Sequence, residues 1–347
     1  MKSLLTIAML SVAMLATSIA SAADVVRRIG QSDFRGDIVS MSPLVVGIDT
    51  KPVKEDVSVG DIDYITYDNE PAALSNARDK IDNGQYEAAL EQLGTLDIGT
   101  ISRPEIVQDV KFYYAKAQAK MALSGSGDVD VRTAGRNMAT FLDPKEGNTG
   151  SYHVIEANLL LGELVAAGGS VDNAKRYFGE AAKANWPTGK LEAILGLAQA
   201  YQRANQWDQA LPLYRQVADA AGSGPQIERL KLAAQLGLAA SLAGTGKLEE
   251  GLEIVKKVIL TAEKGDYALH GRAYNTLGAA YQAAQQPKDA LLAYLHTDVL
   301  YFQDAEHHAE SLANLAQLWA QVNNPQRQRD AEARLQRMYP KSRWANK

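Results

Sequence analysis

The sequence predicts a mainly α-helical protein in which a curved row of stacked helix pairs, an α-solenoid, follows a small all-β, barrel-like domain. Two patterns predict this fold class. Over most of the 347 residues, apolar side chains recur at helical spacing, and small and bulky residues alternate at matching offsets in successive segments. Residues 24–69 show short runs of period-two alternation instead. The chain has no cysteine, so its stability must come from buried apolar surface without disulfides.

The first 22 residues have the composition of a targeting segment. Lys2 supplies a positive charge, residues 4–15 are apolar, and Ala-Ser-Ala at 20–22 has the small-x-small pattern of a cleavage site. The apolar run is too short to favour a membrane span. We therefore expect a signal peptide over residues 1–22, cut after Ala22, and a mature protein that is periplasmic or secreted. An uncleaved signal anchor is the alternative.

Residues 24–69 predict a small β-rich module. Five short runs rich in Val, Ile and Tyr are separated by Gly, Pro and Asp, and residues 62–67 alternate as on a half-buried strand. Residues 36–43 resemble the first hairpin of SH3-like and Sm-like barrels, which implies a strongly bent antiparallel barrel. A module of this size has a marginal core of its own. We expect it mainly to cover the first helix pair, with a binding role as the alternative.

After Pro71 the sequence keeps the period of amphipathic helices. The clearest unit spans residues 271–303, where Tyr274, Leu277, Gly278 and Tyr281 are followed by alanine and aromatic residues at 290 and 294. Small residues occur where two helices must approach closely, and aromatic rings fill the space around them. This pattern resembles the tetratricopeptide repeat (TPR).

The resemblance covers roughly residues 71–340 and implies a right-handed superhelix of about seven helix pairs over residues 71–343, with a concave inner face. A non-repetitive helical bundle is the alternative. The predicted units span residues 73–93, 104–141, 158–178, 194–214, 238–255, 271–303 and 312–338.

The end of the chain resembles the last repeat of several bacterial envelope TPR proteins. Tyr339-Pro340 is followed by serine at 342 and alanine at 345, as in the cell-division coordinator that works with the Tol–Pal system and in the lipoprotein subunit of the outer-membrane barrel assembly machine. The resemblance implies a cell-envelope setting. The front module is acidic and residues 325–347 are basic, so association between copies through head and tail is a further hypothesis.

The sequence contains no recognisable catalytic constellation. It lacks a His-Glu-x-x-His motif, a nucleophile elbow and a phosphate-binding loop. His307 and His308 would project about 100° apart on a helix, which is poor geometry for chelation. We expect Glu306 and Glu310 beside them on an exposed, polar helix start. No catalytic residue, metal or cofactor is expected. An enzyme site at the seam between the front module and the first repeats is a further hypothesis.

Composition also bears on the class of partner. The net charge of −5, without basic–aromatic interleaving, argues against nucleic acid. The TPR resemblance implies that the first helix of each pair lines a concave groove for partner segments. The paired Lys and Asn of carboxylate-clamp members are missing, so we expect a Gln- and Glu-rich groove suited to extended peptide or a basic segment. The expected groove residues are Glu156, Glu163, Glu192, Gln199, Gln202, Arg203, Arg272, Asn275, Gln282, Glu310, Gln317 and Gln321.

For each of these residues the alternative is simple solvation. As a whole, the sequence predicts a non-enzymatic interaction scaffold or adaptor of the cell envelope that binds other envelope proteins or peptide segments and is not an integral membrane protein. The alternative function is binding of cell-wall glycan or another carbohydrate.

Overall fold

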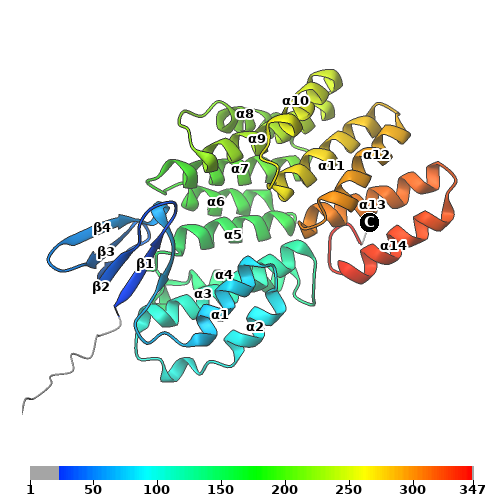
Figure 1. Cartoon of the computed structure of the whole chain (residues 1–347). Helices are drawn as coiled ribbons and strands as arrows, with labels where there is room; N and C mark the ends of the chain where they lie inside the picture. The colour runs from blue at the N-terminus through cyan, green and yellow to red at the C-terminus, as the bar shows by residue number, and fades with distance from the viewer. Residues whose placement is uncertain (1–22, 346–347) are drawn as a thin grey trace, which may run out of the picture.

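The structure, a computed structural model, describes residues 23–345; the predicted signal peptide lies outside the described residues. The described chain contains five β-strands followed by fourteen α-helices (Figure 1). The strands are β1 (Asp24–Arg28), β2 (Phe34–Met41), β3 (Val45–Asp49), β4 (Lys54–Ser58) and β5 (Ile62–Thr66). The helices are α1 (Ala72–Asp82), α2 (Tyr86–Gly94), α3 (Pro104–Ser124), α4 (Val131–Phe141), α5 (Val154–Ala167), α6 (Val171–Ala181), α7 (Pro187–Arg203), α8 (Trp207–Ala218), α9 (Pro225–Gly244), α10 (Leu248–Thr261), α11 (Tyr267–Ala283), α12 (Pro287–Leu300), α13 (Ala305–Gln321) and α14 (Pro325–Met338). Within residues 23–345, no helix has the length and apolar character needed to cross a membrane.

The five predicted strands form one antiparallel sheet in the order β4-β3-β2-β1-β5. Val26 of β1 lies opposite Phe34 of β2 on one side and Ile65 of β5 on the other. β2 pairs with β1 as far as Gly36 and with β3 from Asp37 onward, and the register of the β2–β3 pair shifts between Ile38 and Ser40. The edge strands β4 and β5 do not pair with each other, so the sheet is open. The expected barrel is therefore not closed.

The front module completes its core against the helices, which explains why its sheet stays open. Ile48 and Ile65 are fully buried and belong to the same apolar cluster as Leu74 of α1 and Phe112 of α3. This cluster continues to Leu161 on α5, so the module and the first helix pairs share one core. An element that covers the end of a helix row buries its apolar face in this way.

The helices form seven consecutive hairpins, α1/α2 to α13/α14, in agreement with the predicted repeat number. Successive first helices, from α3 to α13, also contact one another, whereas each second helix packs mainly on the first helices. The row is therefore concave on the side of the first helices. It curves far enough for α13 to contact α3, which brings the last repeat back to the second one (Figure 1).

Small residues allow the close packing inside each hairpin. A Cβ atom on Gly278 of α11 would lie 2.7 Å from the ring of Tyr294 on α12, and one on Gly162 would lie 2.9 Å from the ring of Phe178. Ala198 of α7 is fully buried. The predicted close approach of the two helices at Gly278 is confirmed, and Gly162 and Ala198 lie at equivalent packed positions.

The turns between paired helices share one local geometry. In all seven hairpins of the described chain, a residue with φ between 56° and 88° follows the first helix: Gly84, Gly125, Gly169, Asn205, Gly246, Gln285 and Asn323. In six of them the next amide donates back into the helix, as Gln206 N does to Tyr201 O at 2.9 Å. This left-handed cap satisfies carbonyls at the helix end and reverses the chain. The exception is the second hairpin, where a longer loop follows Gly125.

Candidate functional site

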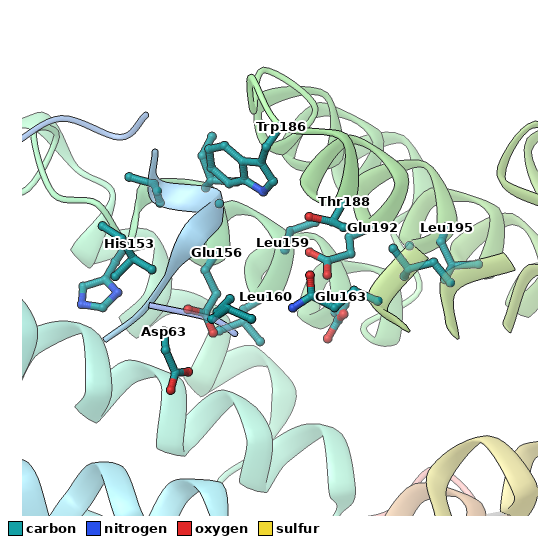
Figure 2. Close-up of a pocket in the computed structure, with 18 of the residues that line it drawn as sticks. Asp63, His153, Glu156, Leu159, Leu160, Glu163, Trp186, Thr188, Glu192 and Leu195 are labelled. Carbon is teal, nitrogen blue, oxygen red and sulfur yellow. The ribbon is translucent and has the colours of Figure 1, made fainter. Parts of the chain in front are cut away.

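The main candidate site is a cavity of about 570 Å³ on the concave face, where the front module meets α5, α7 and α9 (Figure 2). Its walls differ in character. Apolar side chains line one part, including Ile155, Leu159, Leu160, Trp186 and Leu195. Polar side chains line the other, including Asp63, Lys120, Glu156, Glu163, Glu192 and Gln199.

Trp186 connects the cavity to the front module. It precedes the proline that starts α7, and its indole packs against Gly60 in the turn before β5. A Cβ atom at position 60 would lie 2.3 Å from Cγ of the indole, so only glycine allows this contact. The module thus contributes to the cavity wall as well as covering the helix row.

The carboxylates of Glu156, Glu163 and Glu192 turn into the same space (Figure 2). Glu156 forms an ion pair with Lys116 of α3 at 2.8 Å. Burial alone would raise the pKa of Glu156, but the attraction of Lys116 lowers it. The side chains of Glu163 and Glu192 form no hydrogen bond and no salt bridge within residues 23–345, although Glu163 attracts the nearby Lys120. The cavity therefore holds two carboxylates that the described chain leaves unpaired.

The environment of Glu192 favours its protonated form. The side chain of Glu192 is exposed within the concave face, where partial loss of solvent, together with the charges of Glu156 and Glu163, raises its pKa from 4.5 to about 7. The same carboxylates have the opposite effect on the neighbouring Lys120, whose charged form they favour. Burial would lower the pKa of its ammonium group, but the attraction of Glu163 and then Glu156 raises it.

A second charged cluster lies where α13 faces α7. Glu306 Oε1 accepts from Arg203 Nη2 at 2.9 Å and from Arg343 Nη2 at 3.2 Å. Burial would raise the pKa of Glu306, but Arg203, Arg343 and other nearby cations lower it from 4.5 to about 2. Glu306 was expected on an exposed helix start. The structure differs because the curvature of the row turns the start of α13 toward α7.

The histidines at the start of α13 are also less exposed than the sequence predicted. His308 is buried and lies between Tyr339 O–H, 2.8 Å from Nδ1, and Asp298 Oδ1, 2.8 Å from Nε2. Burial would lower the pKa of His307, but Asp304 and then Glu310 raise it. Within residues 23–345, no group of three histidine or acidic side chains is arranged to hold a metal ion.

The structure divides the predicted groove residues into four sets. Glu156, Glu163, Glu192 and Gln199 line the cavity. Arg203 and Glu310 belong to the cluster around α13, and the charge of Arg272 acts on Glu306 there. Gln317 and Gln321 are exposed on the second half of α13. The role of these residues in a partner groove stays a prediction.

The remaining three predicted groove residues make hydrogen bonds within the fold. Gln202 accepts from the hydroxyl of Tyr214, and Gln282 accepts from that of Tyr294 at 2.8 Å. In both hairpins a glutamine on the first helix thus holds a core tyrosine of the second. Asn275 is buried and donates to His307 O at 2.8 Å and to Glu310 Oε2 at 3.1 Å.

Sequence reasoning missed several residues of these clusters. Lys116 and Lys120 lie one turn apart on α3. They occupy the positions that face the groove on the first helix of the other repeats. They were missed because the long loop of this hairpin made the repeat difficult to align with the others. Trp186 carries no repeat signal. Arg343 belongs to the basic tail, but the structure pairs it with Glu306 of the same chain, as it pairs Arg334 with Asp298 at 2.6 Å.

Ionisable side chains also gather at the seam between the front module and the helices. Asp109 of α3 is fully buried and accepts from Arg78 at 2.9 Å, and its other oxygen lies 3.0 Å from His153 Nε2. Arg78 also pairs with Glu70 at 2.7 Å. Tyr67 of the module donates to Asp109 at 3.3 Å. These groups bind one another, with Arg78 Nε as the one buried nitrogen of the arginine that has no partner among residues 23–345. The arrangement fastens the module to α1, α3 and α5.

Comparisons with known proteins agree with this fold. No family model and no curated protein matches the chain. Among solved structures, it is similar to a tetratricopeptide repeat protein from Parabacteroides merdae, with 15% identity over 77% of this chain and 92% of that chain and a TM-score of 0.51. It is also similar to a Rap protein complexed with Competence and Sporulation Factor, with 12% identity over 79% of this chain and 76% of that chain and a TM-score of 0.53. At these identities the likeness shows the fold alone, a TPR-like solenoid.

Proposed function

We propose that this protein is a non-enzymatic interaction scaffold that binds a segment of another protein on the concave face of its TPR-like solenoid. The cavity of about 570 Å³ beside the front module carries this proposal. Its volume lies within the range of about 300–1,000 Å³ typical of ligand pockets, and it combines an apolar wall with a few polar groups. The Rap protein that shares the fold is complexed with Competence and Sporulation Factor, which supports a binding role for this architecture.

The proposal of a scaffold rather than an enzyme rests on how the ionisable groups are used. The seam carries the densest cluster described above, and Asp109 at its centre is fully buried with its oxygens engaged by Arg78, His153 and Tyr67. A catalytic group must reach the reacting atoms. These side chains instead hold two parts of the fold together.

In this proposal the protein works in the cell envelope and its partners are envelope proteins. The support is the signal-like segment at residues 1–22 and the resemblance of residues 339–345 to the last repeats of envelope TPR proteins. Determination of the amino-terminal sequence of the protein from its native cell tests this part. The proposal expects a mature chain that begins at Ala23, and a chain that retains residues 1–22 would contradict cleavage.

The binding face is tested by filling the cavity. Gln199 lines it, whereas Gln216 is exposed on α8, the second helix of the same hairpin. We expect wild-type protein and Q216W to co-isolate the same proteins after cross-linking in the native cell, and Q199W to lose them. Full retention by Q199W would contradict binding at the cavity. Retention of cell-wall glycan without any protein would contradict a protein partner.

A further inference from the structure

We infer that the cavity recognises a lysine or arginine side chain of the partner segment, with an apolar neighbour of that residue packed against the cavity's apolar wall. This inference rests on the proposed function, because it names what a bound segment must present. Two features carry it: the balance of charge and the shape of the walls. The lack of a metal-binding arrangement within residues 23–345 and the environment of Glu192 agree with it.

The cavity has carboxylates without partners but few free cations. The side chains of Glu163, Glu192 and Asp63 form no hydrogen bond and no salt bridge within residues 23–345. Of the cations that line the cavity, Arg229 is committed to Asp266 at 2.6 Å. Lys120 is the remaining one in the described chain, and no fixed partner holds it. An incoming cation would therefore meet unpaired negative charge, whereas an acidic side chain would be repelled.

The walls fit a cation on an aliphatic stem. Leu159, Leu160 and Leu195 lie beside the carboxylates, and Trp186 stands at the edge of the same space (Figure 2). Lysine and arginine bury an apolar stem while their charged ends stay with polar groups. A residue next to the basic one can then cover the leucines and the indole, so that one segment uses both walls.

A small metal ion does not explain the carboxylates. Metal ligands must converge on a point at short range, and no such group of acidic or histidine side chains occurs within residues 23–345. Spread-out carboxylates suit the longer reach and several donors of an ammonium or guanidinium group.

The protonation of Glu192 agrees with this assignment. Its pKa of about 7 reflects partial loss of solvent and the nearby Glu156 and Glu163, which a bound cation would offset. Binding of the cation should release a proton from Glu192 near neutral pH. Affinity for a basic segment should therefore rise between pH 6 and pH 8.

A random dodecapeptide library displayed on phage tests the inference with the whole mature chain. Three proteins are panned in parallel: wild type, E163Q/E192Q, and the control E249Q/E253Q, which changes two exposed glutamates on α10. We expect wild type and control to enrich peptides with Lys or Arg beside an apolar residue. We expect E163Q/E192Q to select peptides without this basic preference.

Affinities of one selected peptide are then measured by fluorescence anisotropy. The loss of charge-assisted contacts in the cavity should weaken binding by about tenfold for E163Q/E192Q. A peptide in which norleucine replaces the basic residue should lose a similar factor on the unaltered protein, a result that does not depend on the folding of any variant.

The outcomes separate this inference from the proposed function. Peptides enriched without Lys or Arg, or a basic preference that persists in E163Q/E192Q, would overturn the inference and leave peptide binding standing. Failure of all three proteins to enrich any peptide would overturn both.

Discussion

Arg203 on α7 and Glu306 on α13 are separated by 103 residues in the chain, yet their side chains meet at 2.9 Å across the concave face. Arg343 reaches the same carboxylate, and Lys341 N donates to Gly125 O at 3.2 Å, just beyond α3. The end of the chain therefore closes the row of helices onto its own second hairpin. A partner segment must enter a concave face that is bounded on this side by residues 339–345.

The ion pairs of Glu306 should stabilise the protein in a pH-dependent way. Its pKa is about 2 in the folded state against 4.5 for an unperturbed side chain, so the stabilisation is complete above pH 4.5 and is lost as the pH falls toward 2. Because the pairs are partly accessible to solvent, we expect E306Q to lower the free energy of unfolding at pH 7 by about 1–2 kcal/mol. Urea denaturation at pH 7 and pH 3 measures this. A deficit that is equal at both pH values would contradict the account.

Glu192 should make the stability of the protein depend on pH in the opposite direction to Glu306. Its pKa is raised to about 7, so its protonated form stabilises the fold below pH 4.5, and this contribution is lost as the pH rises through 7. We expect E192Q to match wild type at pH 4.5 and to exceed it at pH 8, by less than about 1 kcal/mol because the side chain is exposed to solvent. Thermal unfolding at both pH values provides the measurement, with E249Q as the control. A loss of stability in E192Q at pH 8 would count against unpaired carboxylates in the cavity.

Asp109 should control how firmly the front module is held. D109N leaves Arg78 without one of its two buried anionic partners and weakens the contacts to His153 and Tyr67. Disruption of a buried ion pair by removal of one charge costs about 3–5 kcal/mol. We expect faster hydrogen exchange throughout β1–β5 in D109N. The exposed Asp219, changed to asparagine, should alter neither stability nor exchange, and unchanged exchange in D109N would show that the network does not fasten the module.

Two glycines test the packing inside the hairpins. A methyl group on Gly278 would lie 2.7 Å from the ring of Tyr294, whose hydroxyl is held by Gln282. Overpacking of this kind costs about 1–3 kcal/mol, so G278A should be destabilised. Gly179 on α6 is exposed, and a Cβ atom added there would have no neighbouring atom within 4 Å. The free energy of unfolding of G179A should therefore rise by up to about 1 kcal/mol, because alanine has the higher helix propensity. Urea denaturation of both variants is the measurement. A destabilised G179A, or a neutral G278A, would contradict this view of the repeats.

Local patterns in the sequence predicted the helix pairs and the strands well. The spacing of Gly278 and Tyr294 reports a contact within one hairpin, and the alternation in residues 62–67 reports one strand. Both signals depend on neighbours in the chain. For the same reason, Glu163 and Glu192 were predicted to face inward, since each follows from the offset in its own repeat.

Relationships between distant repeats were not predictable in this way. The pairing of Arg203 with Glu306 depends on the curvature summed over several hairpins, and a small change per hairpin would separate them. The packing of Trp186 on Gly60 depends on how the module sits on α7. The position of Gln202 and Gln282 in the repeat also did not show that they would accept hydrogen bonds from core tyrosines. A side chain at that position of the first helix can point toward solvent or toward the second helix.

The central claim is that partner protein lies on the concave face, and site-specific photo-cross-linking tests it most directly. A photoreactive phenylalanine derivative is placed in the native cell at Gln199, in the cavity, or at Gln216, on the outer helix of the same hairpin. We predict that irradiation attaches a discrete set of proteins at position 199 and not at position 216. Attachment only at position 216, or at neither position, would contradict the account.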